Sequence, residues 1–337
     1  MIWLLGGSTE DAWLDGDLAF LIGALVILLL CLGIGFLSML FSRAKIRRKR
    51  EIMYTRCDLH THSTFSDGTA TPEALVAEAE RLGLRAIALT DHNTVDGLPS
   101  FLAAAEGKRV RAVAGIEIST DYGDTELHVV GLFLKEEQYD AIKALLDELR
   151  KNKERSNLAL IERLNAAGYD LDYDELKASS PSGNINRAHV ATILTQRGYT
   201  ESVKEAFDTL LAKDGGFYEQ PKRLPTLDVI SFLNAIGVVS VLAHPLLSMD
   251  KDALCALLPE ARAHGLDAIE THYSTYDEET TALATEIARE YGLLESGGSD
   301  YHAARKPDIS LGVGRGTLTV PYSFLEALEK RNAEKAV

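Results

Sequence analysis

The sequence has few cysteines and comparatively few basic residues. Its three cysteines lie far apart and form no Cys-x-x-Cys pair, which excludes a disulfide framework and a thiolate zinc finger. Lysine and arginine total 35 against 50 aspartates and glutamates, giving a net charge of -15. This deficit argues against a protein that binds duplex DNA through a broad basic surface. A phosphorylated substrate is still allowed, because bound metal ions can reverse the local field.

Neither a disordered nor a collagen-like chain fits the composition. Hydrophobic residues make up 46% of the 337 residues and charged residues 25%, which is the balance of a globular protein. The length suits a large α/β barrel or two ordinary domains. We infer no protein partner from these features.

One long hydrophobic run lies near the N-terminus. Residues 18–41 carry no charge, and at about 1.5 Å per residue this run can cross a hydrocarbon layer of ~30 Å. Acids but no bases precede the run, and six bases follow it between Arg43 and Arg50. Under the positive-inside rule, everything beyond residue 43 then stays in the cytoplasm. We therefore predict an acidic segment (1–17), a transmembrane helix (18–42) and a basic linker (43–52), in a single-pass protein of the inner (cytoplasmic) membrane.

A second interpretation of this segment stays open. Met53 could itself be the start codon, because the chain from there has the pattern of a complete domain. The preceding residues would then be an upstream extension of the reading frame, and the protein would be cytoplasmic and soluble.

Beyond Met53 one pattern recurs: an amphipathic stretch ends in glycine, and a short apolar run then leads to a histidine or an aspartate. The first stretch begins at Thr71-Pro72-Glu73, which has the signature of a helix N-terminus, and ends at Gly83. Repeated helix–glycine–strand units indicate parallel strands covered by helices. Polar residues at the strand ends fit a barrel with its active site at the C-terminal face. We therefore predict an α/β barrel built from residues 53–156 and 225–337.

Residues 157–224 interrupt this pattern. They contain a loop rich in serine, proline and glycine at 179–184 and helical stretches at 188–198 and 203–211, but no strand that ends in a ligand-type side chain. We predict a helical insertion that caps the mouth of the barrel.

The strongest chemical signal is the run CDLHTHSTFSDG at residues 57–68. Two histidines, two apart at a predicted strand end, point to one side and could hold one metal ion, with an aspartate reaching in from the next loop. The later strand ends carry side chains of the same kind, which surface histidines would not do. The pattern therefore predicts a metal site formed by His60, His62, Asp67, His92, Glu117, His128, His244, Asp300 and His302.

With these motifs the chain resembles the PHP (polymerase and histidinol phosphatase) family over roughly residues 54–332. Within that family it is most similar to the bacterial 3′,5′-nucleoside bisphosphate phosphatases, whose relatives include 5′-to-3′ exoribonucleases that trim short RNA ends. Two features depart from the family. Arg187-Ala188-His189 stands in place of an Arg-Pro-His-like motif, and the N-terminal hydrophobic segment has no counterpart.

The resemblance implies a distorted (β/α)7 barrel with a trinuclear centre that holds two to three divalent ions per chain, commonly Mn²⁺, with Fe²⁺ or Zn²⁺ as alternatives. It implies that Glu117 bridges the first and second ions. The implied ligand groups are His60, His62, Glu117 and Asp300 for the first ion, Glu117, His128 and His244 for the second, and Asp67, His92 and His302 for the third.

Other candidates have open alternatives. Arg187 could clamp a second phosphate or be a solvated residue at a helix start. Beside it, His189 is a candidate for substrate binding, although a structural role suits it as well. His272 could donate a proton to the substrate or be a packed polar residue. Asp58 and Asp91 flank predicted ligands and could orient them.

These features predict a metal-dependent phosphoesterase. The expected partner is a small phosphorylated nucleotide, with removal of the 3′-phosphate of a nucleoside 3′,5′-bisphosphate, or a short RNA end trimmed from the 5′ side. The N-terminal helix, if translated, adds contact with a membrane. Two alternatives remain: a histidinol-phosphate-type phosphatase, and a membrane-tethered sensor that binds a nucleotide without hydrolysing it.

Overall fold

The structure is a computed structural model, and it describes residues 55–178, 185, 187–212 and 216–335. The predicted transmembrane helix (18–42) and its flanking segments lie outside the described residues, so the membrane anchor stays a prediction. Among the helices that are described, none combines the length and the apolar character needed to cross a membrane.

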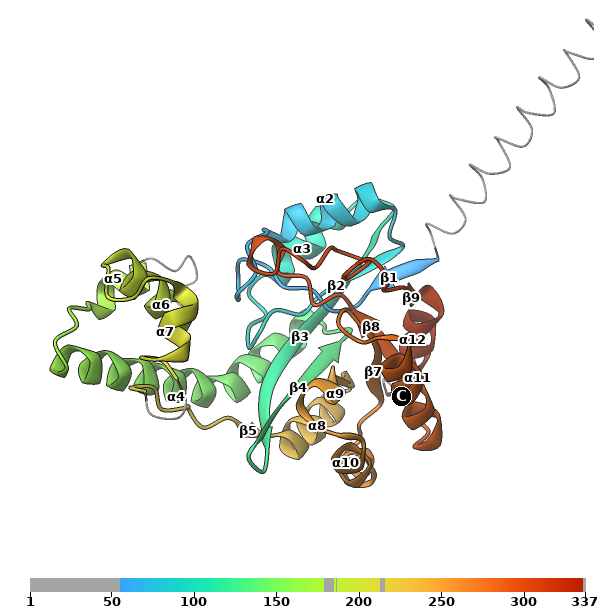
Figure 1. The fold of residues 1–337 in the computed structure, drawn as a ribbon. Coiled ribbons are helices and arrows are strands. Elements are labelled where there is room, and N and C mark those ends of the chain that lie inside the picture. The colour runs from blue at the N-terminus through green and yellow to red at the C-terminus, as the bar shows by residue number, and fades with distance from the viewer. Residues whose placement is uncertain (1–54, 179–184, 186, 213–215, 336–337) are drawn as a thin grey trace, which may run out of the picture. The chain divides into compact units, whose positions relative to one another are not determined.

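Helices and strands alternate along most of the described chain (Figure 1). The strands are β1 (Arg56–Asp58), β2 (Ala86–Leu89), β3 (Arg111–Tyr122), β4 (Thr125–Leu132), β5 (Leu224–Pro225), β6 (Val239–Ala243), β7 (Ala268–Tyr273), β8 (Leu294–Gly298) and β9 (Val320–Pro321). The helices are α2 (Pro72–Leu82), α3 (Leu98–Ala105), α4 (Tyr139–Ala166), α5 (Tyr173–Ala178), α6 (Arg187–Gln196), α7 (Val203–Asp208), α8 (Thr226–Ala235), α9 (Pro245–Ser248), α10 (Lys251–Ala263), α11 (Glu278–Glu290) and α12 (Tyr322–Lys335). Two 3-10 turns complete the order, η1 (Glu136–Gln138) and η2 (Ala303–Arg305).

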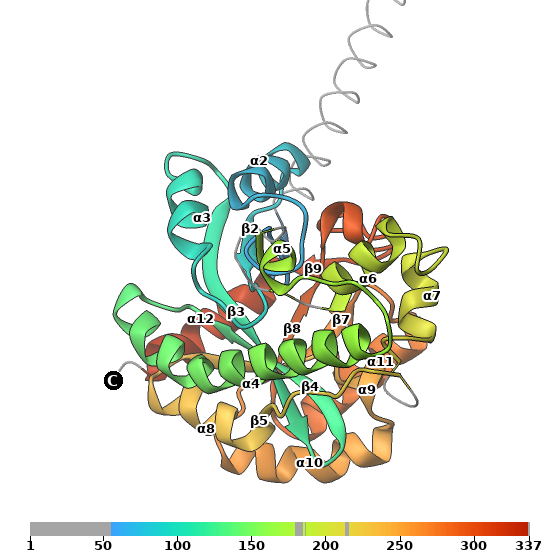
Figure 2. The ribbon, with the colours of Figure 1, turned by 90° about the vertical axis from the view of Figure 1, so that its left-hand side faces the viewer.

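A nearly closed ring of strands forms the centre of the fold. Neighbouring strands follow the order β8-β7-β6-β4-β3-β2-β1-β9, and β5 pairs with β3. The ring closes through backbone hydrogen bonds from Leu59 N to Gly297 O (3.1 Å) and from Asp300 N to His60 O (2.9 Å). Helices such as α2, α3, α8, α10 and α11 lie around the strands (Figure 2). The predicted α/β barrel is therefore confirmed.

The barrel departs from a regular alternation of parallel strands and helices at β4. This strand follows β3 through a tight hairpin and pairs antiparallel with both β3 and β6. By contrast, β1, β2 and β3 are parallel to one another, as are β6, β7 and β8. The hairpin replaces the helix that would otherwise connect two parallel strands, so the ring is distorted where β3 and β4 extend beyond it.

Alternate strand residues pack to opposite sides of the ring. In β2, Ile87 and Leu89 belong to an outer core between strands and helices, whereas Ala86 and Ala88 belong to an inner core. Helix α12 adds Leu325 to the inner core, where it is fully buried. Hydrophobic packing thus fills both sides of the strands and leaves their C-terminal ends for polar side chains.

The helix that the sequence predicts after Thr71 is confirmed as α2. The Thr71 side chain accepts a hydrogen bond from Ala74 N, and Pro72 occupies the first turn. The helix ends at Gly83, which has a φ of 70° and donates to the carbonyls of the last turn. This cap turns the chain directly into β2 and so sets where the polar residues after β2 emerge.

The helical segment at 157–224 contains α5, α6 and α7 and has a hydrophobic core of its own. Its predicted start lies inside the continuous helix α4. Ile142 and Leu146 of α4 pack in the outer core of the barrel, whereas Leu160 and Leu164 pack in the core of the helical segment. The chain returns to the barrel at β5, where Leu224 pairs with Thr120 of β3.

Candidate metal centre

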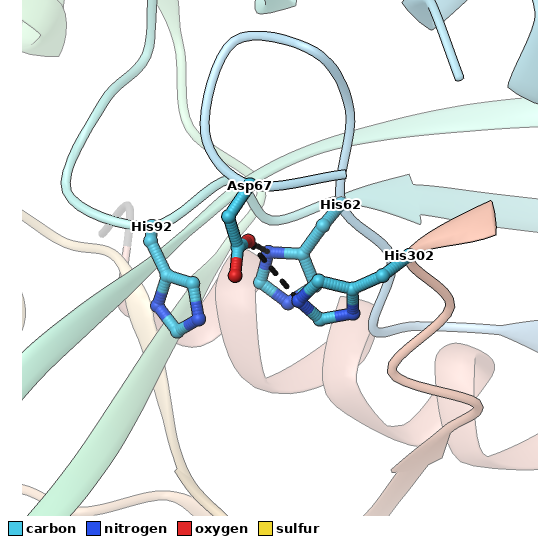
Figure 3. Close-up of side chains that lie close together, drawn as sticks. All are labelled: His62, Asp67, His92 and His302. Carbon is cyan, nitrogen blue, oxygen red and sulfur yellow. Dashed lines mark ion pairs between the residues drawn. The ribbon is translucent and has the colours of Figure 1, made fainter. Parts of the chain in front are cut away.

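The structure brings all nine predicted metal ligands together at one end of the strand ring. They belong to or follow β1, β2, β3, β4, β6 and β8. Within each of four overlapping groups, ligand atoms of the members lie within 4.8 Å of one another. The groups are His62, Asp67, His92 and His302 (Figure 3); His60, Glu117 and His244; His60, His62 and Asp300; and His92, Glu117 and His128.

The Glu117 side chain lies at the middle of this arrangement. Its Oε1 atom faces His128 Nδ1 (2.8 Å) and His244 Nε2 (3.2 Å). Its Oε2 atom faces three other ring nitrogens: His60 Nε2 (3.2 Å), His62 Nε2 (3.2 Å) and His92 Nδ1 (3.0 Å). Because each oxygen faces a different set of imidazoles, the carboxylate is placed as a bridge between two ions would be.

The group in Figure 3 matches the predicted third set with one addition. Asp67 Oδ1 lies 3.0 Å from His302 Nε2 and 3.9 Å from His62 Nδ1. His62 therefore turns one ring nitrogen toward Asp67 and the other toward Glu117 and Asp300. The prediction assigned His62 to the first group alone, whereas the structure places it between two groups.

The hydrogen bonding of the candidate ligand atoms is consistent with metal binding. Within the described residues, six buried ligand atoms have no hydrogen-bond partner: His60 Nε2, His62 Nδ1 and Nε2, Asp67 Oδ1, His92 Nδ1 and Glu117 Oε2. Buried polar atoms are nearly always hydrogen-bonded, so this concentration indicates atoms that are arranged for cations. A mixed set of imidazole and carboxylate ligands without thiolate suits borderline divalent metals rather than calcium.

Electrostatics at the site favour ionised carboxylates. Burial alone would raise the pKa of Glu117, but the neighbouring histidines His92, His60 and His128 hold that pKa well below its usual range. Burial opposes a charge on His62 as well, yet Asp300 and Glu117 raise its pKa to about 10. Burial lowers the pKa of His92 to about 3. Protons and metal ions therefore compete for ring nitrogens here, and ion binding releases protons.

Glu270 is a site residue that the sequence analysis missed. Its Oε1 accepts a hydrogen bond from His60 Nδ1 (2.9 Å), and its Oε2 accepts one from the His244 backbone (2.8 Å). The side chain is buried. His244 has a φ of 29°, which is strained for a residue with a side chain, so this hydrogen bond also stabilises its backbone. The available signal was a carboxylate inside an apolar strand.

Asp58 and Asp91 accept hydrogen bonds from backbone amides and serine hydroxyls rather than from the imidazoles that they could orient. Asp91 accepts hydrogen bonds from Ser63 N (2.7 Å) and from the hydroxyls of Ser63 and Ser66. It thereby fixes the loop that carries Asp67. Asp58 accepts from Ser299 N (2.8 Å) in the same manner, next to the Asp300 ligand.

Arg187 and His189 begin helix α6 in the helical segment. The Arg187 guanidinium lies over the Tyr218 ring, 4.2 Å from its centroid, and 5.6 Å from that of Phe207. Burial lowers the pKa of His189, and Arg305 lowers it further. Arg305 follows the predicted ligand His302 by three residues. His189 therefore interacts electrostatically with the segment that carries this predicted ligand. Substrate roles for both residues stay predictions.

The His272 side chain makes packing contacts. Its ring centroid is 5.1 Å from that of Phe324 in α12, and its Nδ1 atom is 2.9 Å from the Thr271 hydroxyl. Burial lowers its pKa. These contacts join β7 to α12 and do not support a catalytic role, which stays an untested prediction.

Comparison with known proteins adds independent information. A family model described as the PHP domain matches residues 58–218. A 5′-3′ exoribonuclease of Haemophilus influenzae is 30% identical over 74% of this chain and 91% of its own. A phosphoribosyl 1,2-cyclic phosphate 1,2-diphosphodiesterase of Eggerthella lenta is 31% identical over 76% of this chain and 98% of its own. A 3′,5′-nucleoside bisphosphate phosphatase of Chromobacterium violaceum is 27% identical over 73% of this chain and 87% of its own.

A solved structure agrees with these relatives. A protein from Bifidobacterium adolescentis described as a metal-dependent phosphoesterase superposes with a TM-score of 0.70 at 28% identity. The superposition covers 82% of this chain and 96% of that one.

We expect Glu117→Gln to lower the metal content of the Mn²⁺-reconstituted protein more than His128→Ala does. The first substitution removes the charge that faces histidines of several ligand groups, whereas His128 belongs to one group. Elemental analysis of both purified variants makes the comparison. If Glu117→Gln kept the wild-type metal content, the shared role of this carboxylate would be wrong.

Glu270→Gln should weaken metal affinity by about 10–100-fold, because an imidazole ligand loses the partner that orients its ring. Titration with Mn²⁺ under competition from a chelator measures the affinity. The matched control is Glu295→Gln on the next strand, whose carboxylate accepts from Thr271 and Thr285. Equal losses in the two variants would indicate a general effect of acid removal rather than ligand orientation.

Proposed function

The chain belongs to the PHP domain family and is a metal-dependent hydrolase of phosphoester bonds, and we propose that it removes a phosphate monoester from a small nucleotide. The proposed substrate is a nucleoside 3′,5′-bisphosphate, which loses its 3′-phosphate. Trimming of short RNA from the 5′ end is the related activity that we propose beside it. The names of the Chromobacterium violaceum and Haemophilus influenzae relatives support this pair of substrates.

The observation that carries the reaction class is the shared Glu117 carboxylate with imidazoles on both of its oxygens. We propose three ions, Mn²⁺ first among them, held by the nine ligands in the groups described above. Bound divalent ions supply Lewis-acid activation of water and neutralise charge on phosphoryl oxygens. The chain contributes a largely buried ligand set, in which Glu270 orients His60 while Asp58 and Asp91 hold the adjoining backbone.

Basic side chains of the helical segment and of α4 support a substrate with two phosphates. Burial lowers the pKa of Lys153 in α4, and the carboxylate of Asp67, a predicted ligand, opposes that effect. The Arg187 guanidinium lies over the Tyr218 ring, 4.2 Å from its centroid, and an arginine fork can make two hydrogen bonds to one phosphate. We assign the second phosphate of the substrate to Arg187, with His189 beside it.

A panel of substrates tests this function, with phosphate release measured for the monoesters and mononucleotide release measured for RNA. The panel contains nucleoside 3′,5′-bisphosphates, 3′- and 5′-mononucleotides, histidinol phosphate and short 5′-phosphorylated RNA, each offered to the Mn²⁺-loaded protein. We expect the highest kcat/KM with a bisphosphate. A preference for histidinol phosphate would establish the alternative phosphatase, and nucleotide binding without any release would establish the sensor.

Arg187→Ala should lower kcat/KM by about ten-fold or more for a 3′,5′-bisphosphate, because a charge-assisted hydrogen bond contributes about 1.5–3 kcal/mol. The loss should be small for a monophosphate, since the cleaved phosphate is held elsewhere. Arg187→Lys keeps the charge and serves as the matched variant for the loss of the planar fork. Equal losses on both substrates would show that Arg187 supports the fold or contacts the cleaved phosphate instead.

A further inference from the structure

The two carboxylate oxygens of Asp300 have different surroundings. Oδ1 faces three ring nitrogens of the metal centre: His62 Nε2 (3.1 Å), His302 Nδ1 (3.3 Å) and His60 Nε2 (3.8 Å). Oδ2 is turned away from them and accepts hydrogen bonds from the Tyr273 hydroxyl (2.7 Å) and from Lys306 Nζ (2.6 Å). The ligand atom of Asp300 is therefore Oδ1, while Oδ2 is held by two donors of different kinds.

The two donors differ in their access to solvent. Tyr273 is buried, as are Asp300 and His302. The Lys306 side chain retains 37% exposure. Its backbone is nevertheless fixed, because Lys306 N donates to Ala303 O (3.2 Å) at the end of η2. Lys306 thus places an ammonium group where the buried Asp300 carboxylate meets solvent.

The charge of Lys306 suits a phosphate at this position. An ammonium group has three donors, and the contact with Asp300 uses one. The candidate centre contains three carboxylates, Asp67, Glu117 and Asp300, which repel a phosphate dianion unless cations offset them. Nearby cations strengthen the hold on phosphoryl oxygens through short, charge-assisted hydrogen bonds.

We propose that Lys306 is a substrate-binding residue that contacts the phosphate group being cleaved. This inference rests on the proposed function, because it concerns the phosphate brought to the same metal centre. It differs from the role assigned to Arg187, which concerns the second phosphate. Neither the predicted ligand set nor the sequence motifs included Lys306.

Binding of inorganic phosphate to the Mn²⁺-loaded full-length protein tests the proposal, measured by calorimetry. We expect Lys306→Met to weaken phosphate binding by about ten-fold or more, the size expected for one charge-assisted contact. Metal content should match the wild type, because Oδ1 of Asp300 and its histidine neighbours are unchanged. Lys306→Arg, which keeps a cation at the site, should recover most of the affinity.

Two comparison variants separate a direct contact from an indirect effect of the lysine. Tyr273→Phe removes the other donor to Asp300 Oδ2, so an equal loss of phosphate affinity there would show that Lys306 acts only through Asp300. Arg305→Met removes an exposed cation one residue away, so an equal loss there would show a diffuse field. Either result overturns the proposal, as does wild-type affinity in Lys306→Met.

Turnover distinguishes failure of this inference from failure of the proposed function. With a bisphosphate and a mononucleotide, Lys306→Met should lose kcat/KM by similar factors, because both present a phosphate for cleavage. Wild-type protein that hydrolyses neither would refute the proposed function. Active wild-type protein with an equally active Lys306→Met variant would refute the role of Lys306 alone.

Discussion

The arrangement of the site depends on one buried carboxylate, that of Glu117. Five imidazoles converge on its two oxygens, and they belong to residues in β4 or just after β1, β2 and β6. Glu117 itself lies in β3, between β2 and β4 in the sheet. A single sheet edge could not bring these strands to one point. The nearly closed ring can, because the ends of its strands surround a common centre. The distorted barrel is therefore the geometric condition for a shared ligand.

This arrangement is costly for the protein alone. A buried polar atom that lacks a hydrogen-bond partner costs about 1–3 kcal/mol. Among the described residues, all but two of the buried side-chain atoms without a partner belong to the predicted metal ligands. Two ligands, His244 and Asp300, also have positive φ angles of 29° and 53°. Ion binding offsets these costs, so metal affinity and fold stability are coupled. Hydrogen bonds such as that from His244 N to Glu270 maintain the strained backbone.

The sequence predicted the barrel and the clustering of the nine candidate side chains, because both follow from local patterns. Strand ends with His or Asp recur along the chain, and each strand needs only its neighbours to direct that residue to the common end. It gave no guide to the direction of a side chain where that direction depends on a local irregularity of the strand. Glu270 and His272 would share a face in a regular strand, but the pairing of β7 with β8 shifts register between them. Glu270 therefore reaches His60, whereas His272 packs against Phe324. Lys306 was missed because its position depends on the turn η2 after the last ligand.

The helical segment is joined to the barrel at both of its ends by structured elements. At its start, α4 contributes Ile142 to the barrel core and Leu164 to the core of the segment, so one helix connects the two. At its end, Arg223 forms ion pairs with Asp121 (3.1 Å) and with Glu126 (2.6 Å), and Glu126 in turn contacts the ligand His128 at 3.4 Å. Arg223 has 13% exposure, so these pairs are better shielded than ordinary surface ion pairs. The chain that delivers Arg187 is thus connected through Glu126 to a ligand of the metal centre. The same residues that return the helical segment to the barrel also constrain one of the imidazoles on Glu117.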